Sequence, residues 1–179
     1  TPLAPLDGGA YSFSAWVKRP ADSENHRRIF EFHGVDEQGN NIGGYFNDVV
    51  LKFETVSDDS GPKMTYWVYH GTTEVMTAST SATFLIDTWV HVSLNHNVDG
   101  TVKIYWDDTE VSSSSIPLPL AANRKWIFNT FEGSMKQISI FNGIDNVNSW
   151  IQNWNVYTHD TTKKYWIPDQ VHVKTITSL

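Results

Sequence analysis

The stretch from Thr88 to Asp108, TWVHVSLNHNVDGTVKIYWDD, constrains the fold of this chain most strongly. Hydrophobic side chains recur at every second position on both sides of a turn: Val90, Val92 and Leu94 before it, and Val102, Ile104 and Trp106 after it. This alternation is typical of β-strands with one buried face. The turn ends at Gly100, which can adopt the positive φ that a short hairpin loop requires. The stretch therefore predicts a β-hairpin whose hydrophobic face needs a second layer of structure to cover it.

Similar patterns, separated by turn-forming residues, run through most of the chain. We expect further strands, at a spacing of roughly 8–12 residues, at Tyr11–Lys18, Arg28–His33, Val49–Val56, Met64–His70, Glu74–Leu85, Lys125–Phe131 and Ser134–Asn142. Glu110–Val111 is expected to continue the central hairpin briefly, and Ser112–Ser115 to cross the surface. Ile116–Leu120 contains two prolines and is expected to form an irregular edge.

The C-terminal part carries two further elements. Asp145–Trp154 is the one plausible helix, because Asp145 or Asn146 can cap it and its large apolar residues share one stripe. Lys163–Ile176 alternates again and is a candidate closing strand, interrupted at Pro168. Without a repeat or a domain boundary, residues 1–179 are expected to form one domain. The prediction is an all-β, two-sheet antiparallel sandwich of the jelly-roll type with one short C-terminal helix.

Composition narrows the classes of function. A formal charge of −7 argues against nucleic acid or an anionic membrane as partner. No apolar run approaches the roughly 20 residues of a membrane span. Cysteine is absent, which excludes disulfides, thiolate metal sites and cysteine nucleophiles. The chain starts at Thr1 without a signal peptide or an initiator Met, so we expect a processed product or an excised domain.

Four segments, in this order, resemble the laminin G-like, concanavalin A-like group of jelly-roll domains: YSFSAWVKRP, WVHVSLNHNVDGTVKIYWDD, FEGSMKQISIFNG and DNVNSWIQNW. They span Tyr11 to Trp154. Two departures stand out. Where the family commonly begins with a strand that carries Phe-Asp-Gly, this chain has only Leu6-Asp7-Gly8-Gly9, so the first strand is expected to be short or absent, with Lys163–Ile176 as its candidate replacement. Lys136-Gln137 stands where the family often has acidic residues, which argues against a calcium ion of the family type.

The same fold includes glycoside hydrolases and polysaccharide lyases, so the fold alone does not settle function. Retaining glycosidases need two carboxylates about 5 Å apart, and the family's hydrolases supply them from a Glu-x-Asp-x-x-Glu strand. Glu31 stands alone on its strand, and Asp107, Asp108 and Glu110 cluster at a strand end. Alginate-type lyases of this fold use a Gln-x-His strand with Arg-rich and Tyr-bearing strands. Only Gln170-Val171-His172 matches, so we predict that the protein is not an enzyme.

Metal binding has weak support in the sequence. The seven histidines are scattered, with no His-x-His or Glu-x-x-His set that would place two ligands on one face. Oxygen-rich loops offer Asp36, Asp58 and Asp59 as candidate ligands of a structural Ca²⁺, although none has the ordered ligand series of an EF-hand. Apart from that calcium ion, no cofactor is predicted.

The remaining candidates for ligand binding are aromatic side chains on the strand faces that point away from the core. Trp16, His91 and Tyr105 occupy the non-aliphatic positions of three strands that the resemblance makes neighbours or near-neighbours, and Trp67 and Tyr69 add to them. A sugar ring can stack its C–H face on such rings, whereas packing under loops is the alternative use. The rim loops Gly34–Gly44 and Ser57–Lys63 are further candidates for ligand contact.

These observations leave three hypotheses. The leading one is a non-catalytic recognition or adhesion module that binds a glycan or a glycosylated surface. The second is a structural or decoration protein of a virus particle or cell-surface assembly, whose aromatic face and tail are buried against protein neighbours. The third is a carbohydrate-active enzyme of the same fold. Under the first two, the protein is expected outside the cell, at a cell surface or at a virion surface.

Overall fold

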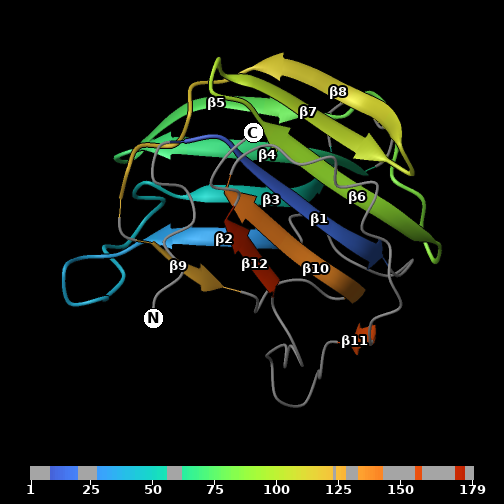
Figure 1. The fold of residues 1–179 in the computed structure, drawn as a ribbon, viewed down its shortest axis with the longest axis horizontal. Helices are drawn as coiled ribbons and strands as arrows, with labels where there is room; N and C mark the ends of the chain where they lie inside the picture. Colours follow the sequence, from blue (N-terminus) through green and yellow to red (C-terminus); the bar gives the residue numbers. More distant parts are fainter. Residues whose placement is uncertain are drawn as a thin grey trace.

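The computed structural model describes residues 9–19, 28–55, 62–122, 124–127, 133–142, 156–158 and 172–175. These residues form two β-sheets that pack face to face around a hydrophobic core (Figure 1). They form no helix, and therefore none long and apolar enough to cross a membrane. The predicted two-sheet, all-β architecture is confirmed, whereas the predicted helix at Asp145–Trp154 lies outside the described residues.

The larger sheet contains the predicted central hairpin. Its order is β11-β10-β1-β6-β7-β8, and β12 also pairs with β10. The strands are β1 (Tyr11–Lys18), β6 (Trp89–His96), β7 (Thr101–Trp106), β8 (Thr109–Ser115), β10 (Ser134–Asn142), β11 (Val156–Thr158) and β12 (His172–Thr175). All pairs are antiparallel except β10 and β12, which run parallel. The strand β12 falls within the predicted closing segment Lys163–Ile176.

The smaller sheet has five antiparallel strands in the order β5-β4-β3-β2-β9. They are β2 (Arg28–Gly34), β3 (Val49–Thr55), β4 (Pro62–His70), β5 (Thr73–Ser79) and β9 (Arg124–Ile127). A long loop joins β2 to β3, and a tight turn at Gly71 joins β4 to β5.

The alternating hydrophobic positions of both sheets meet in one core. On β1 these are Tyr11, Phe13, Ala15 and Val17, none of which is more than 1% exposed. The other strands contribute Phe30, Phe32, Val49, Leu51, Met64, Tyr66, Val68, Val90, Val92, Leu94, Val102 and Ile104. Because side chains alternate between the two faces of a strand, the residues between them lie on the outer faces of the sandwich. The candidate functional residues therefore divide between two surfaces that point in opposite directions.

Two sequence-based boundaries were wrong. Ser112–Ser115 is not a surface crossing but the second half of β8. The turn before it is made by Asp107 and Asp108, both with positive φ, so this hairpin forms without the glycine that usually signals one. The second arm of the β4–β5 hairpin ends at Ser79 and not at Leu85. The strand ends there because the Thr80 hydroxyl accepts the Met64 N–H (3.1 Å) and donates to the Ala82 carbonyl (3.1 Å), which turns the chain away.

A chain of hydrogen bonds crosses the hydrophobic core. His96 Nε2 lies 2.9 Å from the Ile116 carbonyl, which can only accept, so Nε2 carries the proton. Burial lowers the pKa of His96, the ring is neutral, and Nδ1 must accept the hydrogen bond of the Tyr66 hydroxyl, 3.0 Å away. The Tyr66 oxygen then accepts from the hydroxyl of Tyr11. The core thus contains a single, directed chain of donors: Tyr11, Tyr66, His96.

Replacing Tyr66 with phenylalanine is expected to lower the free energy of unfolding by about 1–3 kcal/mol, because the buried His96 Nδ1 loses its donor. Tyr11→Phe is the matched control: it also removes one hydroxyl from this chain but leaves the His96 nitrogen satisfied, so its loss should be about 1 kcal/mol. Urea unfolding at neutral pH measures both. If the Tyr11 variant were the less stable of the two, the assigned direction of the chain would be wrong.

Candidate functional site

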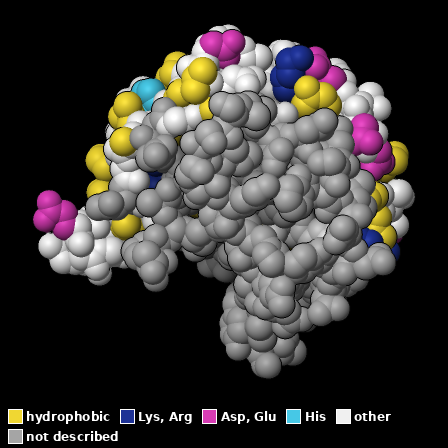
Figure 2. Space-filling model, in the orientation of Figure 1, with side chains coloured by type: hydrophobic (Ala, Val, Ile, Leu, Met, Phe, Trp, Pro, Cys, Tyr) yellow, Lys and Arg dark blue, Asp and Glu magenta, His cyan; other side chains and the backbone are white. Residues whose placement is uncertain are grey.

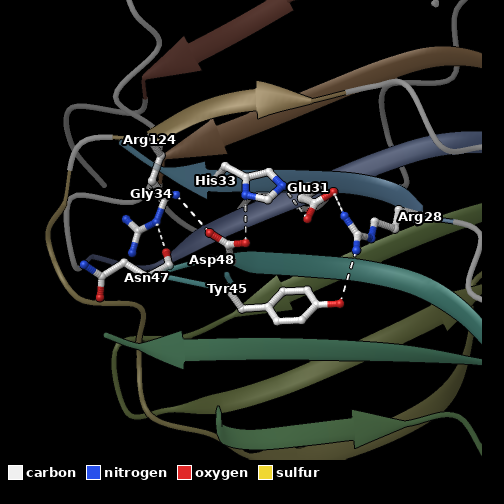
Figure 3. A network of polar contacts seen from close by, with 8 residues as sticks. All are labelled: Arg28, Glu31, His33, Gly34, Tyr45, Asn47, Asp48 and Arg124. Atoms are coloured by element: carbon white, nitrogen blue, oxygen red, sulfur yellow. Dashed lines mark hydrogen bonds and ion pairs between the residues drawn. The ribbon is translucent and has the colours of Figure 1, made fainter. Parts of the chain in front are cut away.

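The outer face of the smaller sheet carries a cluster of charged side chains. On β2, Phe30 and Phe32 point into the core, so Glu31 and His33 point outward. Asp48 precedes β3, the neighbouring strand, and reaches His33 from the opposite side of the ring (Figure 3). Although they face away from the core, Glu31 and Asp48 have an exposed fraction of 0%. Buried carboxylates need compensating partners, which defines the chemistry of this cluster.

His33 bridges the two carboxylates. Its Nε2 lies 2.6 Å from Glu31 Oε1, and its Nδ1 lies 2.9 Å from Asp48 Oδ2. Burial alone would lower the pKa of His33, but the contacts with Asp48 and Glu31 outweigh burial and raise the pKa to about 9. With a carboxylate at each ring nitrogen, His33 is doubly protonated at neutral pH and carries a positive charge.

Arg28 completes the neutralisation of the cluster. Its guanidinium pairs with Glu31 Oε2. Burial would raise the pKa of Glu31, but the contacts from His33 and Arg28 prevail and lower it. Two buried carboxylates are therefore balanced by two cations, and Glu31 remains ionised.

The same cluster fixes the loop between β2 and β3. Asp48 Oδ1 accepts the Gly34 N–H at 3.0 Å, which closes the base of the loop. Asn47 then ties the loop to the β4–β5 turn, because its N–H donates to the Gly71 carbonyl (2.8 Å) and its Oδ1 accepts the Gly71 N–H (2.7 Å). Arg124 from β9 donates its Nε–H to the Asn47 carbonyl at 2.7 Å. Three elements of the smaller sheet thus hold one end of this loop in place.

Tyr45 projects from this fixed end of the loop and presents an aromatic surface. Its ring stacks on Tyr69, with centroids 5.0 Å apart and planes inclined by 12°, and Tyr69 in turn packs against Trp67 at 5.9 Å. Cations flank the series: Lys52 Nζ lies 3.6 Å from the Trp67 ring centroid, and the Arg28 guanidinium carbon lies 5.6 Å from that of Tyr45. Tyr69 is 5% exposed, whereas Tyr45 is 42% exposed. Tyr45 is therefore the accessible ring of this stacked pair.

The five aromatic residues predicted from the sequence do not form one site. Trp67 and Tyr69 belong to the face just described. Trp16, His91 and Tyr105 lie on the outer face of the larger sheet, on the opposite side of the sandwich. One small ligand cannot contact both groups.

On the larger sheet, the predicted residues pack against their neighbours. The rings of Trp16 and His91 lie 5.3 Å apart, and His91 Nε2 is 2.8 Å from the Ser14 hydroxyl. Only 4% of His91 is exposed. Lys136 Nζ lies 5.3 Å from the Trp16 ring centroid. Tyr105 is half-buried one strand further along the sheet.

The calcium prediction concerned three aspartates, of which Asp58 and Asp59 lie outside the described residues. Asp36 organises its own loop: Oδ1 accepts the N–H groups of Gln38 (3.0 Å) and Asn40 (2.8 Å), and Oδ2 accepts the Asn40 amide at 3.1 Å. These bonds, led by the Asn40 N–H, lower the pKa of Asp36. Both carboxylate oxygens of Asp36 therefore already accept hydrogen bonds within the turn. A Ca²⁺ ion bound by Asp36 stays a prediction.

The described side chains contain one group that could hold a metal ion. The potential ligand atoms of Glu31, His33 and Asp48 all lie within 4.8 Å of one another. A metal ion would have to displace a proton from His33 and would lie close to the Arg28 guanidinium. The balanced charges fit a protonated histidine better than a divalent cation.

Five residues of this face were not identified as site residues from the sequence: Arg28, Glu31, His33, Tyr45 and Asp48. Glu31 is the one acid on β2, as predicted, but the carboxylate of Asp48, just before the neighbouring strand β3, converges with that of Glu31. One sequence pattern could have indicated this cluster. In Arg28–His33, Glu31 and His33 alternate with two phenylalanines, which is typical of a strand whose outer face carries charge. Nothing in the sequence pairs that strand with Asp48, because the pairing depends on the order of strands in the sheet.

Comparison with known proteins places this geometry in context. No curated protein sequence matches the chain. Among solved structures, the native heptameric SAP-like pentraxin from Limulus polyphemus matches with a TM-score of 0.55 and 11% identity, over 82% of this chain and 70% of that one. An alginate lyase from Alteromonas sp. 272 (TM-score 0.44, 13% identity, 69% of this chain and 53% of that one) and the galectin LEC-6 from Caenorhabditis elegans (0.41, 10%, 70% and 78%) are more distant. The pentraxin shows a shared fold and nothing further.

The sequence itself carries a stronger match, which agrees with the two-sheet architecture and with the resemblance noted above. Residues 1–152 match the family model of the concanavalin A-like lectin/glucanase superfamily, and the chain belongs to this family.

Proposed function

We propose that the protein is a non-catalytic recognition module that binds a glycan on the outer face of the smaller sheet. The observation that carries the proposal is the exposed ring of Tyr45, which is stacked on Tyr69 at the fixed end of the β2–β3 loop. Aromatic rings held rigidly before the ligand arrives lose little conformational entropy on binding, which favours recognition. The site lies beside an exposed loop, where ligand contacts are common.

In this proposal, the C–H face of a sugar ring packs on Tyr45, and polar groups at the margin bind its hydroxyls. Arg28 Nη2 lies 3.3 Å from the Tyr45 hydroxyl, and the half-buried guanidinium has further N–H groups beside the ring. Glu74 is exposed next to Tyr69. These groups supply donors and acceptors around the aromatic surface, as saccharide hydroxyls require.

The state of the two carboxylates supports binding without catalysis. A general acid in glycoside hydrolysis needs a raised pKa so that it is protonated before the reaction. The pKa of Glu31 is lowered, and both Glu31 and Asp48 are buried in contact with His33. Neither carboxylate is placed to exchange a proton with a substrate on the surface. A glycan-binding role also implies a location where glycans are exposed, such as a cell or virion surface.

A glycan array, run with and without EDTA, identifies the ligand, and calorimetry on the best glycan then measures affinity. Tyr45→Ala should weaken binding at least tenfold, or about 1.4 kcal/mol, because the stacking surface is lost. Tyr105→Ala is the matched control, since it removes a surface tyrosine from the opposite face and should leave affinity unchanged. Binding that depends on Tyr105 and not on Tyr45 would move the site to the larger sheet, and an array without any bound glycan would refute the proposal.

A further inference from the structure

Arg28 presents unused hydrogen-bond donors beside the accessible Tyr45 ring. A guanidinium carries five N–H groups and no acceptor. Among the described residues, two side chains accept from Arg28: Glu31 contacts Nη1, and the Tyr45 hydroxyl lies 3.3 Å from Nη2. Each terminal nitrogen therefore keeps a second N–H that neither contact uses. Figure 3 shows the guanidinium beyond the hydroxyl end of the Tyr45 ring.

The Tyr45 hydroxyl adds a donor to the same margin. Its oxygen accepts the Arg28 Nη2–H, so its own proton is left to donate, and no described residue accepts that proton. The exposed carboxylate of Glu74 instead borders Tyr69, the covered ring of the stacked pair, with 3.5 Å between Oε2 and the Tyr69 hydroxyl. The side chains that border the accessible ring thus offer donors.

The charges of this cluster differ in their exposure. The side chain of Arg28 is 24% exposed and that of His33 is 17% exposed, whereas the two carboxylates are at most 1% exposed. A ligand on the surface would meet the cations, because the carboxylates are shielded from solvent. This local sign is opposite to that of the chain, which has 20 acidic and 13 basic residues; acidic side chains are spread along the margin of the molecule in Figure 2. Charges more than about 8 Å apart are largely screened at physiological salt, so the nearby cations govern the site.

We infer that the ligand of this site is an acidic saccharide, a step that rests on the proposed function. The sugar ring packs on Tyr45, and a carboxylate or sulfate at its edge accepts hydrogen bonds from Arg28 and from the Tyr45 hydroxyl. An oxyanion only accepts hydrogen bonds, which matches a margin of donors, whereas a neutral hydroxyl brings a donor that needs a different acceptor. Hydrogen bonds from a guanidinium to an anion are about twice as strong as those between neutral groups.

Arg28 is held in place before the ligand arrives. Its Nη1 contacts Glu31, and Glu31 is held in turn by His33, at 2.6 Å from Nε2. Little side-chain freedom is therefore lost when Arg28 binds the anion. Because the ligand uses N–H groups that Glu31 does not, the buried carboxylate keeps its partner in the filled site.

The glycan array tests the inference through pairs of glycans that share a backbone and differ in charge: uronates with their methyl esters, and sulfated glycans with their desulfated forms. We expect the acidic members to bind, with at least tenfold less binding of the neutral members. The two kinds of pair also distinguish a carboxylate from a sulfate. Equal or stronger binding of the neutral members would overturn the inference and leave the proposed function intact. An array without any bound glycan would refute the proposed function, and this inference with it.

Calorimetry on the best acidic glycan and its neutral counterpart then tests the role of Arg28. Arg28→Gln should weaken binding of the acidic glycan at least tenfold and change that of the neutral glycan little, because only the contacts with the anion are lost. Tyr45→Ala, by contrast, should weaken binding of both glycans, since it removes the stacking surface. Lys103→Gln is the matched control: it removes one positive charge from the outer face of the larger sheet and should leave both affinities unchanged.

A second variant separates binding from folding. Arg28→Lys keeps a positive charge beside the buried Glu31 carboxylate but lacks the planar fork of N–H groups. It should therefore remain folded, as urea unfolding measures, and still bind the acidic glycan more weakly than the natural chain does. Unchanged affinity of both Arg28 variants for the acidic glycan, or an equal loss of affinity for its neutral counterpart, would overturn the inference.

Discussion

Alanine at position 34 is expected to lower the free energy of unfolding by about 3 kcal/mol or more, the upper range for overpacking. A Cβ atom on Gly34 would lie 1.9 Å from the Phe46 carbonyl oxygen and 3.0 Å from its carbonyl carbon. The obstacle is backbone, so no side chain can rotate to make room. Relief would require the β2–β3 loop to move away from β2, which would break the Gly34–Asp48 hydrogen bond and displace Tyr45.

Urea unfolding measures this loss, and calorimetry with the identified glycan shows its effect on the site. Gly39→Ala is a suitable control within the same loop. Gly39 has a φ of +83° and open space around it, so alanine there should cost about 1–2 kcal/mol through backbone conformation alone. It should also leave affinity for the glycan close to that of the natural chain. If Gly34→Ala were as stable as the natural chain, the close approach of Phe46 to β2 would be incorrect.

The protonated state of His33 predicts a second large effect, which depends on pH. His33 has a pKa of about 9 in the folded protein, above its ordinary value of 6.5. A raised pKa contributes stability that is complete below pH 6.5 and is lost as the pH rises through 9. This difference in pKa corresponds to about 3 kcal/mol. The free energy of unfolding should therefore fall by about this amount over that range, as two buried carboxylates lose their shared cation.

His33→Gln removes the titrating group, so urea titrations across the same range should give an almost flat profile. At pH 6.5 the variant should already be about 3 kcal/mol less stable than the natural chain, because Glu31 and Asp48 remain buried without compensation. His91→Gln is the control: burial lowers the pKa of His91, so its contribution changes only below its ordinary value and cannot alter the alkaline slope. An alkaline slope that persists in His33→Gln would show that another group causes it.

Local sequence patterns predicted the core of this fold well. The alternation in Tyr11–Lys18 and in the central hairpin specified which side chains face the core between the sheets, because successive side chains of a strand point to opposite faces. The patterns failed at β8, where serines occupy the positions that face the other sheet. Hydrophobic alternation cannot identify a strand that extends beyond the hydrophobic core. The sequence also failed to indicate the turn before β8, because Asp107 and Asp108 adopt positive φ where a glycine usually marks such a turn.

The candidate site was only partly predictable for a different reason. Trp67 and Tyr69 could be proposed because aromatic residues at outer positions of a strand are visible in the sequence. Tyr45 lies in a loop dense in turn-forming residues, and its orientation depends on bonds from Asn47 to Gly71 and to Arg124, which are distant in the sequence. Long-range pairing of this kind is a property of sheet topology, which no local pattern encodes.

A crystal structure of the protein with the glycan selected by the array locates the ligand most directly. The account predicts electron density for a sugar ring against Tyr45, within reach of Arg28, on the outer face of the sheet formed by β5, β4, β3, β2 and β9. Density against Trp16, His91 or Tyr105, on the outer face of the larger sheet, would contradict it.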